Sequence, residues 1–181
     1  MIDITAKRNT IFAGLNAHLP TGCIAIEANQ AQPKPPYPFV TVLFNGPFQA
    51  GQTHTGKIYI GDNGDADIDY RRTKEEILVL SVTSVGESSA DAMENAMKCV
   101  EWFKWIGYDD LKEAGITVVG IESMTNRDTL IVDDFERRIG FDVRLMVLSD
   151  TTRKESWIGQ IGRKLDDDTT EVMDLKLREL I

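Results

Sequence analysis

The sequence predicts an α+β fold, in which a mainly antiparallel β-sheet carries two α-helices on one face. The prediction comes from an amphipathic segment near the N-terminus, a second amphipathic segment in the middle of the chain, and strand-like segments on either side of the second one. Helices and antiparallel strands in this order leave both helices available to cover the same face of the sheet. With 181 residues, the chain is long enough for one core and short for two full domains.

The first predicted element is a helix over residues 4–18, where apolar residues recur at mostly helical spacing. Asp3 or Thr5 can cap its start, and Pro20 with Gly22 can end it. The segment CIAIEA, residues 23–28, then predicts a short strand.

The next predicted strand is FVTVLF, residues 39–44, and it follows the proline-rich run PKPPYP. The strand is apolar on both alternating faces except at Thr41, and this pattern predicts that both faces of the strand are covered by other parts of the protein. Each proline fixes φ near about −65° and pushes the preceding residue toward extended geometry. We therefore interpret the run as a stiff lead-in to the strand.

Residues 46–72 are rich in turn-forming glycine and contain one short strand candidate at residues 57–60, which predicts a projecting β-hairpin or long loop. A strand over residues 75–85 follows. A helix over residues 89–106 comes next, and the capping box that Ser88 and Asp91 can form marks its start. The stripe predicted to face the core is Met93, Ala96, Met97, Val100 and Phe103.

The last predicted strands are ITVVGIES and RRIGFDVRLMVL, after a helical turn that closes on Gly115. In residues 137–148, apolar residues alternate with polar ones, so one face should be core and the other solvent. From Thr151 onward the pattern weakens. We expect a single domain over residues 1–150, with the hairpin at 46–72, and a C-terminal arm over 151–181 that becomes ordered against a neighbour.

Composition argues against several classes of protein. The net charge of −9 and the sequence pI near 4.7 disfavour a general nucleic-acid binder, which needs clustered Lys and Arg. Two cysteines, Cys23 and Cys99, are too few for a disulfide framework and are expected to be buried in a reducing compartment. We expect neither a secretion signal nor a membrane span, and synthesis in the cytoplasm.

No residue is predicted to be catalytic, to bind a cofactor or to ligate a metal. Asp65, Asp67 and Asp69 superficially resemble a calcium loop, but Tyr70 stands where that loop needs glycine, and Arg71 follows it. His18 and His54 have no other ligands nearby in sequence, and the chain has neither a nucleophile elbow nor a phosphate loop. An enzyme is therefore not expected.

Two alternative functions stay open. The acidic cluster over residues 62–69 would suit a small metal-dependent enzyme. The PxxP spacing of Pro33 and Pro36 would suit an adaptor that a partner domain recognises.

Three apolar groups fall outside the predicted core pattern and are candidates for contact with a neighbouring subunit. The first widens the apolar arc of the second helix. The second, near Leu130, is either a small strand or a docking loop, and the third is a cluster in the arm. The candidate residues are Trp102, Trp105, Ile106, Leu130, Ile131, Trp157, Ile158 and Ile161.

The phrases PKPPYPFVTVLF, EEILVLSVTSVGESSADAMENAMKCVEWF, GITVVGIES and RRIGFDVRLMV resemble the tail-terminator, or neck, proteins of tailed bacteriophages. That family has a first helix, a proline-led strand, a strand that ends in SVxSVG, a second helix and a closing strand of the R-I-G-F-D-V type. The resemblance covers about residues 1–149. The hairpin region near 46–72 and the arm beyond residue 150 have no counterpart in it.

The resemblance implies a structural virion protein without cofactors. Copies would form a ring, often a hexamer, that closes the tail tube and meets head-completion or connector proteins in head-tail joining. Double-stranded DNA would pass through the lumen without sequence-specific binding, and an acidic lumen would keep it from sticking. No membrane is involved, and the expected location is the tail or neck of the virion.

Overall fold

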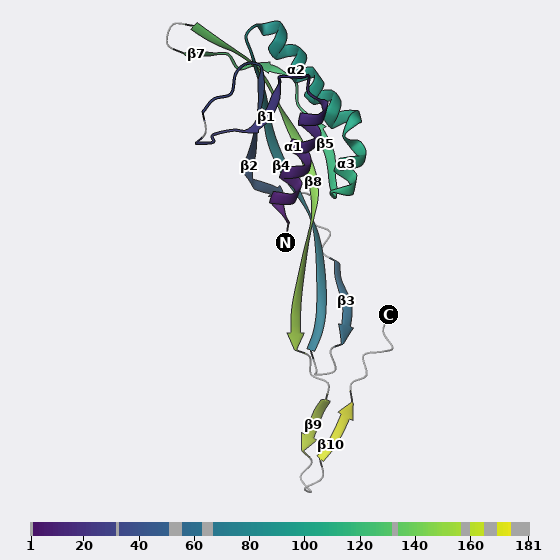
Figure 1. Ribbon diagram of the computed structural model, residues 1–181. Helices are drawn as coiled ribbons and strands as arrows, with labels where there is room; N and C mark the ends of the chain where they lie inside the picture. The colour runs from purple at the N-terminus through teal and green to yellow at the C-terminus, as the bar shows by residue number, and fades with distance from the viewer. Residues whose placement is uncertain are drawn as a thin grey trace. The chain divides into compact units, whose positions relative to one another are not determined.

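The chain forms two compact units, one from residues 1–53 and 74–149 and the other from residues 54–73 and 150–181. The computed structural model in Figure 1 describes residues 2–31, 33–50, 56–62, 67–131, 134–156, 160–164 and 170–174. We refer to the two as unit 1 and unit 2.

The helices of the described residues all belong to unit 1. They are α1 (Ile4–His18), α2 (Ser89–Glu101), the π-helical turn η1 (Trp102–Ile106) and α3 (Tyr108–Glu113). The backbone N–H of Ala6 donates to the Asp3 carboxylate over 2.9 Å and so caps the start of α1. The predicted capping box of Ser88 and Asp91 is confirmed at the start of α2.

The sheet of unit 1 is mainly antiparallel, which confirms the predicted α+β fold. Its strands follow the order β1-β2-β4-β8-β5, where β1 pairs in parallel with β2, and β2 in antiparallel with β4. The short strands β6 and β7 also pair with β8, nearer to its N-terminal end than β5 does. The strands are β1 (Ile24–Glu27), β2 (Phe39–Ala50), β4 (Asp67–Gly86), β5 (Ile116–Ile121), β6 (Thr125–Asn126), β7 (Thr129–Ile131) and β8 (Asp134–Ser156); β4 and β8 contribute residues to both units.

The core lies between α1, α2 and one face of this sheet (Figure 1). The alternation predicted for β8 is confirmed, because its odd-numbered apolar residues from 139 to 147 are buried. Fully buried apolar residues of the other elements include Ile11, Leu15, Val40, Val42, Leu80, Val82, Ala92, Ala96 and Cys99.

The stripe predicted to face the core on α2 is wrong at two positions, since Met93 is 39% and Met97 is 55% exposed. The buried face carries the correctly predicted Ala96, together with Ala92, Asn95 and Cys99. Small side chains let the helix backbone approach the core closely, and Met93 and Met97 consequently face outward, whereas Val100 is half-buried against the core. Sequence hydrophobicity favours the larger residues and so misplaces the stripe.

Trp102, predicted to contact a neighbouring subunit, lies in the core and is only 1% exposed. Its indole is held between two glycines. A Cβ added to Gly14 of α1 would lie 2.1 Å from the ring, and one added to Gly107 would lie 2.4 Å from it. Because both glycines leave room that only the indole fills, Trp102 offers no surface to a partner.

The part of unit 2 that the structure describes includes two antiparallel strand pairs. The strand predicted at residues 57–60 is found within β3 (Gly56–Asp62), which pairs with β4 in a register that places Gly56 opposite Thr73. Asp150 accepts a hydrogen bond from the Thr73 hydroxyl over 2.7 Å and forms an ion pair with Arg71. The other pair is β9 (Gln160–Lys164) with β10 (Thr170–Asp174).

Candidate interaction surfaces

The hairpin of β7 and β8 presents exposed apolar side chains. Leu130 lies opposite Phe135 in the register, and the two are 59% and 52% exposed. Residues opposite each other in an antiparallel pair share a face, and even spacing from the buried Ile139 places this face on the helix side of the sheet. The Arg137 guanidinium lies 5.5 Å from the centre of the Phe135 ring. We call Leu130 and Phe135 the hairpin patch.

A polar contact fixes the base of this hairpin. The Arg127 side chain crosses Gly140 of β8, where an added Cβ would lie 2.6 Å from it. Beyond Gly140, its guanidinium donates to the Ser81 hydroxyl over 2.7 Å and to the Asp142 carboxylate over 3.0 Å. The segment between β6 and β7 is thereby tied to both β4 and β8.

Asp128 secures the same segment from the other side. Its carboxylate accepts hydrogen bonds from the backbone N–H of Arg138 over 2.7 Å and from the Asn126 amide over 3.1 Å. These hydrogen bonds stabilise the charged carboxylate and so hold the pKa of Asp128 below its usual value, and the bond from Arg138 has the largest effect. The base of the hairpin is therefore held on both sides, whereas the hairpin patch remains exposed.

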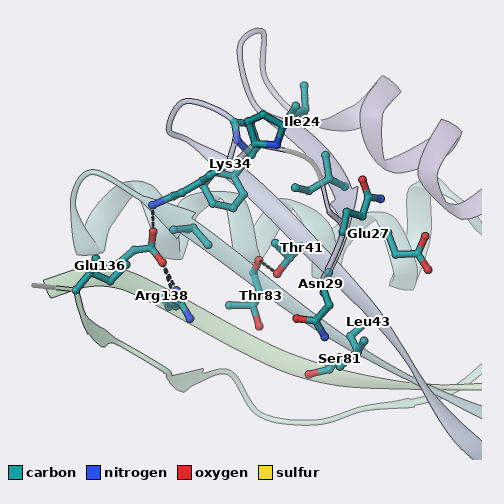
Figure 2. A pocket seen from close by; sticks show the side chains of 18 residues that line it. Ile24, Glu27, Asn29, Lys34, Thr41, Leu43, Ser81, Thr83, Glu136 and Arg138 are labelled. Carbon is teal, nitrogen blue, oxygen red and sulfur yellow. Dashed lines mark hydrogen bonds and ion pairs between the residues drawn. The ribbon is translucent and has the colours of Figure 1, made fainter.

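Glu136 connects the hairpin to the proline-rich segment. Its side chain is 2% exposed, and the Tyr37 hydroxyl donates to it over 2.6 Å. Lys34 and Arg138 also point to this carboxylate, as Figure 2 shows. Burial alone would raise the pKa of Glu136, but the hydrogen bonds from Lys34, Tyr37 and Arg138 outweigh it, so the pKa lies below its usual value.

A groove of about 630 Å³ lies on the sheet face opposite the helices (Figure 2). The strand at residues 39–44 was predicted to be covered on both sides, but Thr41 and Leu43 are only half-buried and line this groove. Gly140 on the corresponding face of β8 was predicted to be solvated, yet it is buried because Arg127 covers it. Glu136, which precedes the predicted strand, is buried on the same face and contacts Lys34. Ile131, 42% exposed, lines the groove from the hairpin side.

A second apolar surface lies where α2 continues into η1. Trp105, Ile106 and Tyr108 are 78%, 51% and 59% exposed, and we call them the helix-end patch. Each backbone hydrogen bond of a π-helical turn spans one more residue than that of an α-helix. This turn points Trp102 and Phe103 inward and leaves the next two apolar residues, Trp105 and Ile106, outside.

A third surface is an open groove of about 550 Å³ beside α2. Met97, Val100 and Met124 form its apolar part, and Glu94, Lys98 and Glu101 line it as well. We call this surface the methionine groove. Sequence reasoning missed it because Met97 was assigned to the core, and no pattern in the chain links Met97 to Met124.

Both edges of the sheet in unit 1 carry devices that hinder pairing with a further strand. At the β1 edge, the Asn16 side chain accepts from the backbone N–H of Ala25 over 2.7 Å and donates to its carbonyl over 3.3 Å. At the β5 edge, the register shifts between Val118 and Gly120, and Val119 is 53% exposed. Such caps and bulges protect edge strands. Contacts through side-chain surfaces are therefore favoured over extension of the sheet.

The remaining predicted residues fall in different places. Trp157 and Ile158 lie outside the described residues, as do Asp65 and His54. Ile161 lies on β9 opposite Met173.

The chemistry of the described residues is sparse. Cys99 is fully buried, and burial raises its pKa to about 12. Among the residues that the structure describes, no three His, Cys, Asp or Glu side chains are grouped to hold a metal ion. Within the same residues, no helix is long and apolar enough to cross a membrane.

Comparison with known proteins identifies a family. A family model described as phage neck terminator protein matches residues 9–171. The search of curated proteins finds no match.

Proposed function

Because the chain belongs to the phage neck terminator protein family, whose members have a structural role in the tail and neck, we propose that its copies form a closed ring that terminates the tail tube. The proposed ring is a hexamer, and it joins the tail tube to the head connector. Double-stranded DNA passes through the lumen, and the protein stays in the neck of the virion.

The observation that carries this proposal is the presence of separate exposed apolar surfaces on one subunit. The hairpin patch lies on β7 and β8, whereas the helix-end patch lies between α2 and α3 (Figure 1). A ring built by head-to-tail contacts needs two different surfaces on each copy. Large exposed apolar groups on a folded domain mark such contacts.

The proposed contact residues follow from this arrangement. Trp105, Ile106, Leu130 and Ile131 are exposed and remain in the proposed interfaces. The aromatic and aliphatic residues of the arm, Trp157, Ile158 and Ile161, are proposed to contact neighbours as well.

Charge supports passage of DNA through the ring. The chain carries 29 acidic residues against 20 lysines and arginines. A lumen with net negative charge repels phosphates, and DNA then slides without being held. No cofactor is needed for this role.

Size-exclusion chromatography with light scattering, repeated in the presence of purified tail tubes, tests the proposal. We expect one discrete oligomer, free or at the tube end, and tubes that stop growing once it is bound. A protein that stays monomeric in both settings would contradict the proposal.

A further inference from the structure

The hairpin patch is preorganised for contact with another molecule. Arg127 and Asp128 hold its base, and Glu136 ties its second strand to the proline-rich segment. Leu130 and Phe135 nevertheless remain more than half exposed. A contact surface that is already fixed loses little conformational entropy on binding.

The methionine groove has the chemistry to receive such a patch. Its apolar part is made by Met97, Val100 and Met124, and Met97 is 55% exposed. Methionine side chains are flexible and adapt to the shape of aliphatic and aromatic partners. The groove therefore suits one aromatic and one branched side chain.

The charges around the two surfaces are complementary. Arg137 holds its guanidinium over the Phe135 ring beside the hairpin patch, where it also lies 3.5 Å from the Asp128 carboxylate. Glu94, Glu101 and Lys98 line the methionine groove, so its charged lining residues sum to a net negative charge, and the His18 imidazole lies 3.6 Å from Glu101. A patch that carries a cation would thus meet a groove that carries an anion.

The patch does not reach the groove of its own subunit. Leu130 lies six residues beyond Met124 along a largely extended segment, a separation of roughly 15–20 Å at the rise of a strand. The contact at the base of the hairpin prevents it from folding back. An occupant with this chemistry must come from another molecule.

We propose that the hairpin patch of one copy docks into the methionine groove of a second copy, with Arg137 facing Glu94 and Glu101. This inference rests on the proposed ring and names the contact that builds it. Since patch and groove are different surfaces of one chain, the contact is head-to-tail and repeats until the ring closes.

Mixing two defective variants tests the contact. One variant carries Leu130→Ser and Phe135→Ser, and the other carries Met97→Asp. Each should lose the ring and remain a folded monomer, because the altered residues are exposed. Mixed in equal amounts, the two retain one intact patch and one intact groove, so they should form a 1:1 dimer that grows no further. Val119→Ser, which changes an equally exposed apolar residue elsewhere on the sheet, should leave the ring intact.

A charge reversal gives a second measurement that does not depend on apolar packing. Arg137→Glu should weaken assembly by at least about tenfold, and Glu101→Arg in the same chain should restore it. Rings that persist in either apolar variant, or a mixture that stays monomeric, would overturn this contact. If the variants contradict this contact while the wild-type protein still forms a ring, the proposed ring function stands without it. A wild-type protein that never assembles contradicts both the contact and the ring.

Discussion

Replacing Glu136 by Gln tests whether the buried carboxylate organises the hairpin and the proline-rich segment. The substitution keeps the shape of the side chain and removes its charge. Breaking a buried ion pair costs about 3–5 kcal/mol when the remaining charge stays buried. The remaining charges here are on Lys34 and Arg138, whose side chains are 44% and 33% exposed and can regain water. We therefore expect a smaller loss, about 2 kcal/mol of unfolding free energy.

Urea unfolding followed by circular dichroism measures this loss, and a melting temperature lower by roughly 4–8 °C should accompany it. Glu27→Gln is the matched control. It removes a carboxylate that contacts Arg8 over 2.8 Å, but both side chains are more than one third exposed, so the loss should stay below about 1 kcal/mol. A Glu136→Gln protein as stable as the control would refute the structural role of the buried carboxylate.

The pH dependence provides an independent check. Since the pKa of Glu136 is lowered in the folded protein, its stabilising effect is present above the unfolded value of about 4.3 and is lost as the pH falls through the folded value. The difference in stability between wild type and Glu136→Gln should therefore shrink as the pH falls below about 4.3. A constant difference down to acid unfolding would contradict this sign.

Three further predictions concern the core and the helix-end patch. Gly14→Ala should lower the unfolding free energy by about 3 kcal/mol in chemical denaturation, because the new Cβ would overlap the Trp102 ring, and Gly107 packs so closely against that ring that it cannot move away. An unchanged unfolding free energy would contradict this packing. Cys99 should react with a thiol reagent only as fast as the protein unfolds, since it is buried with a pKa of about 12, and rapid labelling of the native protein would contradict its burial. Trp105→Ser should change the unfolding free energy by less than about 0.5 kcal/mol, because the side chain is exposed. The same substitution should weaken ring assembly or tube binding by more than about tenfold in light scattering, and assembly of normal strength would show that Trp105 lies outside the interface.

The sequence predicts most of the secondary structure because local periodicity determines it. The alternation of residues 137–148 predicts the central part of β8 but not its extension to Ser156, and the capping box of Ser88 marks the start of α2. The fold class follows from the order of these elements. These features depend on neighbours within a few positions along the chain.

The features that the sequence does not reveal depend on long-range packing. The outward position of Met97 depends on small residues on the opposite face of α2, and the burial of Trp102 depends on Gly14 of another helix. Lys34 and Glu136 are 102 positions apart, so no spacing rule joins them. Phe135 was overlooked as a contact residue because it stands among charged residues.

Electron cryo-microscopy of tail-tube ends incubated with the purified protein tests the ring most directly. The account predicts a closed ring at the tube end, with an open lumen and a head-to-tail contact between neighbouring copies. Tube ends that carry no ring, or a protein bound there as isolated copies, would contradict it.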